Sequence, residues 1–443
     1  MFAVTIILVS LATIYTILKL LNYLKTVPDL YLQQQSYPDP TRLPNESPIY
    51  HSTKSPTGLR LGLDIRYDHY KIRRGNCNDI WEIAMRKQKG NREVEGGRAN
   101  GIYIRGKFVE FATINYYISQ WDNFKYDAIN IPVDHQVDAH WVIVVLICLI
   151  KQVPLQFYDA KLKPETGTLI SEIKLPPPQQ SHDFNNVYSV EKDKGIAIEF
   201  HKVVKLGIDV VVKFTQLNLI SAVASSIKHL PAEYNATGKS MTIVPSSDFA
   251  GVSNTIVKLL MAFVCQMEVH IDETPRFNTE ITCLPESKTL LTDLSWIQNI
   301  KLQFLKMGIF SSTKLAYVHS SISHPRLTSS QLNHLRILTN SHVIREYYTY
   351  NIMGPLLTTD YYEYRTYTRQ FGAMPQSLEM KVNNLSGDGV GNLLVRGYTI
   401  GKSTNYLNGV EQQQQQNANS QGDGFMPVNA RGKWGTDGCF YLI

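Results

Sequence analysis

The chain has 443 residues, 43% of them hydrophobic, which is ordinary for a folded protein and enough for two or three packed subdomains. Its net charge of +6 is modest and its basic residues are scattered, so we expect no nucleic-acid partner, which would require Lys and Arg gathered on one face. The five cysteines lie far apart and form neither a C-x-x-C pair nor a Cys/His ligand set; we therefore expect free thiols in a reducing compartment and no metal site.

The N-terminal residues 1–25 are predicted to form a membrane anchor. Residues 2–18 contain no charged side chain, and apolar residues continue past Lys19, which gives about the 20 residues that a bilayer-spanning helix needs. Basic residues follow this run and none precedes it, so we expect residues 2–24 to contact the membrane and the large domain to lie in the cytosol. A cleaved signal peptide is the alternative, but the usual basic region before the apolar run is missing.

An α/β core is expected over residues 62–386, after an extended linker at 26–61 that is rich in Pro, Gln, Ser and Tyr. In the first third of this core, hydrophobic periodicity predicts helices at 79–87, 112–121 and 140–150, and strands at 102–105, 108–111, 126–132 and 153–158. Helix 140–150 is apolar on all sides but too short for a bilayer, so we expect it inside the core. The order strand, buried helix, strand predicts a right-handed crossover in a parallel sheet.

The alternation of strands and helices continues through the rest of the core. We expect strands at 196–200, 208–214, 242–245, 315–321 and 342–345, and helices at 217–230, 248–265 and 329–338. Residues 387–443 are predicted to form a β-rich lobe, because glycines there provide the corners of short hairpins. Within this lobe, the Gln- and Asn-rich stretch 411–424 is expected to be a mobile surface loop.

Five short sequence motifs follow one another along the chain: FVEFATI at 108–114, VPL at 153–155, FGAMPQSLEMKV at 371–382, GVGNLLVRG at 389–397 and RGKWGTDGCFY at 431–441. In this order the chain resembles the large domain of adenylate-forming enzymes, which include acyl-CoA synthetases, luciferases and the adenylation domains of peptide synthetases. The resemblance implies an α/β fold with two mixed or parallel sheets, flanking helices and a small β-rich lobe. It also implies a C-terminal lid domain after residue 443, which we expect this chain to lack.

The resemblance further implies the place of a nucleotide site. The positions that would hold phosphate, adenine, magnesium and ribose correspond to Thr237, Gly238 and Lys239, to Tyr347, to Asn351 and to Asn429. A Walker-type P-loop is a different possibility for the first three, but Glu233 stands where that motif requires glycine.

Tyr347 matches the aromatic residue of the family pattern, but the chain departs from that pattern in each of the motifs that contain these positions. Glu233 and its neighbours replace small residues, and a carboxylate there would repel phosphate. Tyr348 replaces a glycine, and Asn351 replaces the carboxylate that helps to hold magnesium, for which an amide is a poor substitute. Ala430 replaces the aspartate that binds ribose, which leaves only the adjacent Asn429.

We therefore expect a membrane-anchored, acyl-CoA synthetase-like protein that is catalytically deficient and acts in lipid metabolism by binding a lipid, an acyl chain or a partner protein. Its expected location is the endoplasmic reticulum membrane, with lipid droplets as a second location, and no cofactor is expected. Two alternatives stay open. One is an active long-chain fatty acid-CoA or acyl-adenylate ligase with diverged motifs, which would use ATP and magnesium, and the other is a truncated product without a maintained role.

Overall fold

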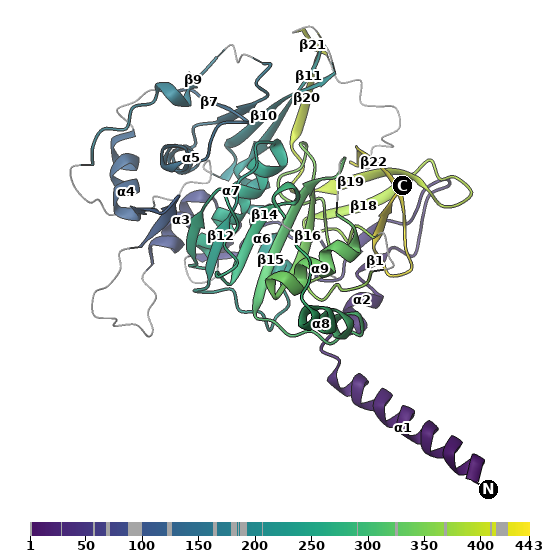
Figure 1. Cartoon of the computed structure of the whole chain (residues 1–443). Helices are drawn as coiled ribbons and strands as arrows, with labels where there is room; N and C mark the ends of the chain where they lie inside the picture. Colours follow the sequence, from purple (N-terminus) through teal and green to yellow (C-terminus); the bar gives the residue numbers. More distant parts are fainter. Residues whose placement is uncertain are drawn as a thin grey trace, which may run out of the picture.

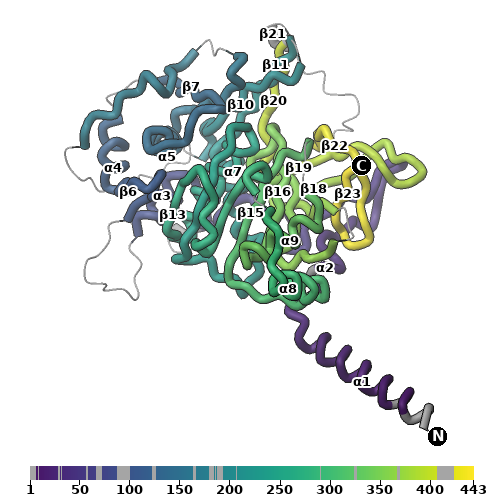
Figure 2. The backbone as a smooth tube through the Cα atoms, viewed as in Figure 1, coloured from purple at the N-terminus to yellow at the C-terminus, as the bar shows by residue number. Residues whose placement is uncertain are grey.

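The body of the protein is built from three large β-sheets with helices packed between and around them, and a long helix projects from one end (Figure 1). The computed structural model describes residues 2–27, 29–55, 58–67, 71–86, 100–121, 126–162, 166–178, 184, 186, 193–205, 207–289, 291–323, 327–366, 370–407, 410–412 and 424–443. Figure 2 shows the N-terminus at the far end of the projecting helix and the C-terminus on the body.

A seven-stranded mixed sheet holds the predicted crossover. Its strands, in spatial order, are β21 (Val410–Gln412), β20 (Lys402–Leu407), β11 (Ile208–Thr215), β10 (Ile196–Lys205), β8 (Leu155–Tyr158), β7 (Ile129–Pro132) and β9 (Thr168–Leu169). Strands β7 and β8 are parallel and are joined by the helix α5 (Ala139–Lys151). The side chain of Asp138 caps the first turn of α5 by accepting from the amide of Trp141, and residues 141–150 are all buried. The prediction of a buried crossover helix is confirmed.

An eight-stranded sheet lies at the centre of the molecule. Its inner strands are parallel and its two edge strands, β17 and β6, are antiparallel. In spatial order the strands are β17 (Leu357–Thr358), β16 (Ser341–Tyr348), β15 (Lys314–Ser321), β14 (Ile281–Pro285), β12 (Ser240–Ile243), β13 (Glu268–Ile271), β5 (Gly101–Ile104) and β6 (Lys107–Glu110).

Helices cover both faces of this central sheet, and the alternation of side chains along each strand assigns residues to one face or the other. On one face, Leu315 and Tyr317 pack in the main core with α7 (Phe249–Val264). That face also receives α3 (Cys77–Met85) and α6 (Gln216–His229), which pack on α7. On the other face, Ala316 and Val318 join a smaller core with residues of α9 (Ser329–Thr339).

A six-stranded antiparallel sheet completes the body and joins the two ends of the chain. In spatial order its strands are β1 (Ser36–Pro38), β2 (Tyr50–Ser52), β18 (Leu378–Asn383), β19 (Gly391–Gly397), β22 (Met426–Trp434) and β23 (Phe440–Leu442). The expected linker 26–61 thus supplies two strands, because a segment without periodicity can still complete a sheet through its backbone. The expected lobe 387–443 is also divided, since β20 and β21 leave it for the seven-stranded sheet. Residues 413–423, most of the predicted loop 411–424, lie outside the described residues.

The remaining elements are α1 (Phe2–Leu24), α2 (Asp29–Gln33), α4 (Phe111–Gln120), α8 (Trp296–Lys306) and the small hairpin of β3 (Ile65–Tyr67) and β4 (Lys71–Arg73). The helix α1 leaves the body beside α8 (Figures 1 and 2). Among the described residues, no helix is both long enough and apolar enough to cross a membrane, so the transmembrane anchor predicted for residues 1–25 is not supported.

Candidate functional site

Polar side chains gather where the parallel strands β14, β15 and β16 end. In open α/β sheets, ligands bind at the carboxyl ends of the strands, so a binding site is expected at this edge. The register of β15 and β16 places His319 beside Glu346, and Glu286 follows β14 directly. Because side chains alternate along a strand, Glu346 faces α7, whereas Arg345 faces the opposite side of the sheet.

On the α7 side, a buried ion pair joins the helix to the sheet. The Nζ atom of Lys258 lies 2.6 Å from Oε1 of Glu346, and the two side chains are 0% and 2% exposed. The same ammonium group lies 3.5 Å from the ring centroid of Tyr317. The hydroxyl of Tyr348 donates to Oε2 of Glu346 at 3.0 Å and accepts from Asn254 at 2.9 Å. Each charge in this cluster is therefore already compensated by a partner inside the protein.

The titratable groups around this pair are held in their neutral forms. Burial raises the pKa of the Tyr348 hydroxyl well above its usual value, and the carboxylate of Glu346 adds to the effect. Burial also raises the pKa of the Cys283 thiol to about 12. Neither group can supply an ionised nucleophile at neutral pH.

His319 is the unusual member of this neighbourhood. Its side chain is buried, and neither ring nitrogen has a hydrogen-bond partner among the described residues. Burial lowers its pKa to about 3, and the nearby positive charges of Lys258 and Lys288 act in the same direction. The imidazole is therefore neutral at physiological pH and makes an edge contact with the Tyr348 ring, at 6.0 Å between centroids.

On the other face of the sheet, a second buried ion pair covers Tyr347. Arg345 donates from Nη2 to Oε1 of Glu286 at 2.8 Å and from Nη1 to the carbonyl of Leu327 at 2.7 Å. Its guanidinium group lies 4.7 Å from the ring centroid of Tyr347, and the ring of Phe371 lies 4.5 Å from the same centroid. Tyr347 is completely buried, so its ring is in contact with protein rather than available to a base.

The phosphate-site candidates Thr237, Gly238 and Lys239 lie in the turn before β12. Gly238 has a φ of +73° and donates its amide to the carbonyl of Cys265 at 3.1 Å, while Lys239 places its ammonium 3.8 Å from the ring centroid of Tyr234. This turn is at the amino end of β12. Because β12 is parallel to the strands up to β16, the turn lies at the edge of the sheet opposite to the ends of β15 and β16.

The other three candidates are divided between two sheets. Tyr347 and Asn351 both lie at the carboxyl end of β16, where the Asn351 side chain accepts from the hydroxyl of Thr349 at 2.8 Å. Asn429 is exposed on β22 of the six-stranded sheet. The structure thus brings Tyr347 and Asn351 to one edge but does not join them with Thr237, Gly238 and Lys239 there.

The sequence-based predictions did not include Lys258 or Glu346, although the sequence around Lys258 indicates that this residue is unusual. Lys258 stands in the apolar run of α7, between Val257 and Leu259, where a charge is costly unless a partner meets it. A lysine in such a run predicts a buried carboxylate, but it does not say which one.

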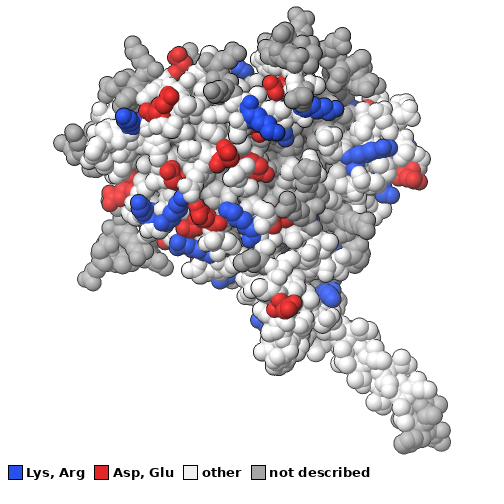
Figure 3. Space-filling model, turned by 45° about the horizontal axis from the view of Figure 1, so that its top comes forward, with Lys and Arg blue, Asp and Glu red and all other residues white. Residues whose placement is uncertain are grey.

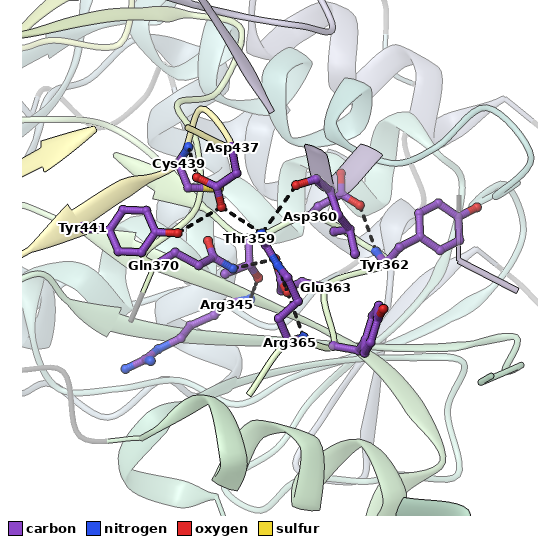
Figure 4. A network of polar contacts seen from close by, with 12 residues as sticks. Arg345, Thr359, Asp360, Tyr362, Glu363, Arg365, Gln370, Asp437, Cys439 and Tyr441 are labelled. Carbon is purple, nitrogen blue, oxygen red and sulfur yellow. Dashed lines mark hydrogen bonds and ion pairs between the residues drawn. The ribbon is translucent and has the colours of Figure 1, made fainter. Parts of the chain in front are cut away.

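A second polar network connects the last residues of the chain to the loop after β17 (Figure 4). Arg365 donates to both carboxylate oxygens of Glu363, at 2.9 and 2.6 Å, and to Oδ2 of Asp437 at 2.8 Å. Gln370 donates to Glu363 at 2.6 Å, and the hydroxyl of Tyr441 donates to Asp437 at 3.0 Å. The planar guanidinium group therefore fastens the β22–β23 turn to the central sheet.

Replacing Arg365 by lysine is expected to lower the free energy of unfolding by about 1.5–3 kcal/mol, because an ammonium group cannot make the forked contact and a charged hydrogen bond is lost. Urea unfolding followed by circular dichroism measures this change. The same substitution at Arg431, which is exposed on β22, is the matched control and should leave the unfolding midpoint unchanged. Equal midpoints for both variants would show that the network does not fasten the turn.

No family model matches the chain. The uncharacterized protein YHR045W of Saccharomyces cerevisiae is 23% identical over 570 aligned positions, which cover 96% of this chain and 95% of the yeast protein. The similarity therefore extends over nearly the whole of both chains.

Solved structures give the fold. VinN in complex with L-aspartate has a TM-score of 0.56 with 10% identity and covers 87% of this chain and 99% of its own. Apo MatB from Rhodopseudomonas palustris has a TM-score of 0.56 with 10% identity, over 83% and 78% of the two chains. The CoA synthetase MenE of Bacillus subtilis, in complex with an acyl-adenylate intermediate, has a TM-score of 0.52 with 11% identity, over 77% and 74%. This chain has the adenylate-forming fold.

The sequence resemblance correctly predicted that fold, including the α/β class and the several mixed sheets. At 9–12% sequence identity, the chain shares the course of its backbone with the solved structures. Within the adenylate-forming fold, this chain places two internally compensated ion pairs at the carboxyl edge of the central sheet.

Proposed function

We propose that the protein is a catalytically deficient, acyl-CoA synthetase-like protein that acts in lipid metabolism by binding an acyl chain, a lipid or a partner protein. One observation supports the catalytic deficiency most directly. Side chains at the carboxyl edge of the central sheet pack inside the protein and not against an open site, and Tyr347 and Tyr348 are completely buried. The acyl class of ligand rests on the fold shared with the CoA synthetase MenE.

The electrostatics of the edge support the same proposal. The cations Lys258 and Arg345 each contact a buried carboxylate, so an incoming phosphate would face Glu346 or Glu286 as well as the cation. Adding negative charge beside a buried carboxylate is unfavourable, and separating either pair would leave a charge uncompensated. ATP binding at this edge would therefore require both pairs to rearrange.

The aromatic and metal positions support it further. Arg345 and Phe371 contact the ring of Tyr347, so an adenine base could reach that ring only by displacing a side chain. Asn351 offers a neutral amide, already bonded to Thr349, where magnesium would favour a carboxylate.

Titration of the purified full-length protein with magnesium-ATP tests the proposal. We expect no saturable heat of binding up to millimolar nucleotide and no exchange of pyrophosphate into ATP in the presence of fatty acids. MatB, for which an ATP-bound structure exists, is the positive control. Saturable micromolar binding together with fatty-acid-dependent exchange would contradict the deficiency and favour an active ligase with diverged motifs.

We also propose that α1 attaches the protein to a membrane, on the cytosolic side of the endoplasmic reticulum and on lipid droplets. Large apolar side chains are exposed over more than half of the circumference of this helix: Ile6, Ile7, Val9, Leu11, Ile14, Ile17, Leu18 and Leu20. A helix with such a broad exposed apolar face is unfavourable in water and favourable in contact with lipid. Flotation of the full chain with lipid vesicles measures this attachment.

A further inference from the structure

The helix α8 exposes its apolar face to solvent. Trp296, Ile300, Phe304 and Met307 follow one another at intervals of three and four residues, so they lie on one side of the helix, with Ile297 beside them. Trp296 is 74% exposed, and the other four range from 42% to 51%. Such a row normally packs against the core of a protein.

The side of α8 that faces the body buries few of the side chains of this helix. Of its side chains, all of them described, only Leu305 is buried. The helix is nevertheless fixed in place, because Ser295 caps its first turn with reciprocal bonds to Gln298 and because it packs against α9. Because the helix is held firmly in place, the exposure of its larger apolar face is not the result of poor packing. An exposed apolar patch of this kind marks a surface that binds another molecule or a membrane.

The start of the chain runs directly over the end of this helix. After α1, the amide of Thr26 donates to the carbonyl of Gly308 at 3.1 Å, and its hydroxyl donates to the carbonyl of Phe310 at 2.6 Å. Gly308 leaves room for Lys25, since an added Cβ would lie 3.0 Å from the Lys25 Cε atom. The exposed apolar surface of α1 therefore ends where the apolar face of α8 begins.

The charged residues of α8 and of the end of α1 are mainly basic. Lys19 lies near the end of α1, and Lys301 and Lys306 lie on α8 outside its apolar row, whereas Asp293 is the single acidic residue between positions 291 and 310. Figure 3 shows Lys, Arg, Asp and Glu intermingled on the body, while the projecting α1 has mainly uncharged atoms. Basic residues beside exposed apolar ones are typical of a surface that meets anionic lipid headgroups.

We propose that α8 lies in the headgroup region of an anionic lipid bilayer, beside the point where α1 leaves the body, and so fixes the orientation of the body on the membrane. This proposal rests on the proposed attachment through α1. A protein partner fits the face less well. A helix of 11 residues is about 17 Å long and about 10 Å wide. The area of one such helix face is far below the roughly 800 Å² of surface that each partner of a stable complex buries.

Quenching of Trp296 by brominated lipid tests the proposal. The full chain is reconstituted in vesicles of phosphatidylcholine and phosphatidylserine that contain brominated phosphatidylcholine. Trp81, Trp121 and Trp141 are buried in the core, and Trp434 packs against Tyr50 and Phe440 in the six-stranded sheet, so Trp296 should account for most of the quenched signal. We expect stronger quenching when bromine is near the headgroup end of the acyl chain than at its tip, because an interfacial helix reaches only about 5–10 Å into the bilayer. Trp296→Phe should abolish this quenching.

A charge on the apolar face provides a matched variant. Ile300→Glu should strongly reduce quenching of Trp296 without reducing flotation, because Ile300 is exposed and α1 is unchanged. Ser330→Glu, which adds the same charge at an exposed position of the neighbouring helix α9, should leave quenching unaltered.

Three outcomes would overturn the proposal, and each has a different meaning. If the chain floats but Trp296 remains accessible to acrylamide, α1 attaches the protein and α8 does not touch lipid. If Trp296 is shielded from both acrylamide and brominated lipid, a protein or a second copy covers the face instead. If the chain does not float, attachment through α1 fails as well, while the proposed catalytic deficiency is tested separately by ATP titration.

Discussion

Replacing Lys258 by methionine is expected to lower the free energy of unfolding by about 3–5 kcal/mol, because it leaves the buried carboxylate of Glu346 without its countercharge. The two side chains are 0% and 2% exposed, so water cannot take over the role of the ammonium group. Asn254 and Tyr348 can still donate to Glu346, but both donors are neutral. Urea unfolding followed by circular dichroism measures the loss.

The double variant Lys258→Met/Glu346→Gln separates the ion pair from simple packing. Removing both charges should recover a large part of the loss, because a neutral amide can still bond to Asn254 and Tyr348. Lys228→Met, at an exposed position of α6, is the control for the substitution itself and should have little effect. If the single and double variants are equally unstable, the ion pair does not explain the stability of this cluster.

Acid is expected to destabilise the protein between about pH 6.5 and pH 3 through histidines whose pKa values are lowered, at about 3–5 kcal/mol for each of His319 and His342. Burial lowers the pKa of His319 to about 3 and that of His342 to about 4, and it also lowers the pKa of His229. In this range the unfolded chain binds protons that the folded chain does not. The stabilisation is therefore complete above about pH 6.5 and is lost as the pH falls toward these values.

The variant His319→Phe tests this account. It removes two buried ring nitrogens that have no hydrogen-bond partner in the described part of the chain, so stability at neutral pH should be unchanged or higher. Stability should also fall less steeply with acid, which urea midpoints measured at several pH values would show. His135→Gln, at a partly exposed loop position, is the control for loss of an imidazole. An unchanged acid slope in His319→Phe would contradict the assignment.

Much of the central fold could be predicted because its elements carry strong local signals. The helix α5 combines a capping Asp138 with an unbroken apolar run, and these two features define its start and its burial. The strands β15 and β16 are likewise within a few residues of their predicted positions, since apolar and β-branched residues mark both. Local pattern and tertiary structure agree in these elements.

The six-stranded sheet could not be predicted in the same way. Strands β1 and β2 contain Pro38, Tyr50 and polar residues without alternation, and their place depends on pairing with the distant strand β18. Backbone hydrogen bonds make that pairing, and they do not require a particular order of apolar and polar side chains along the strand.

The candidate site shows a similar division. The resemblance indicated Tyr347 and Asn351, which do lie at the carboxyl edge, but the burial of Tyr347 depends on Arg345 and Phe371, which surround it only in the folded protein. Lys258 and Glu346 are 88 positions apart, so no local motif could join them.

The pairing of the two chain ends in one sheet determines the order in which the body can form during synthesis. Ser47 accepts a hydrogen bond from the amide of Val382, 335 positions later. At ribosomal rates of roughly 5–20 residues per second, the early segment waits on the order of tens of seconds for its partner strand. Strands β1 and β2 are therefore synthesised long before β18, so their unpaired edges stay open to chaperones and to wrong partners until β18 is made.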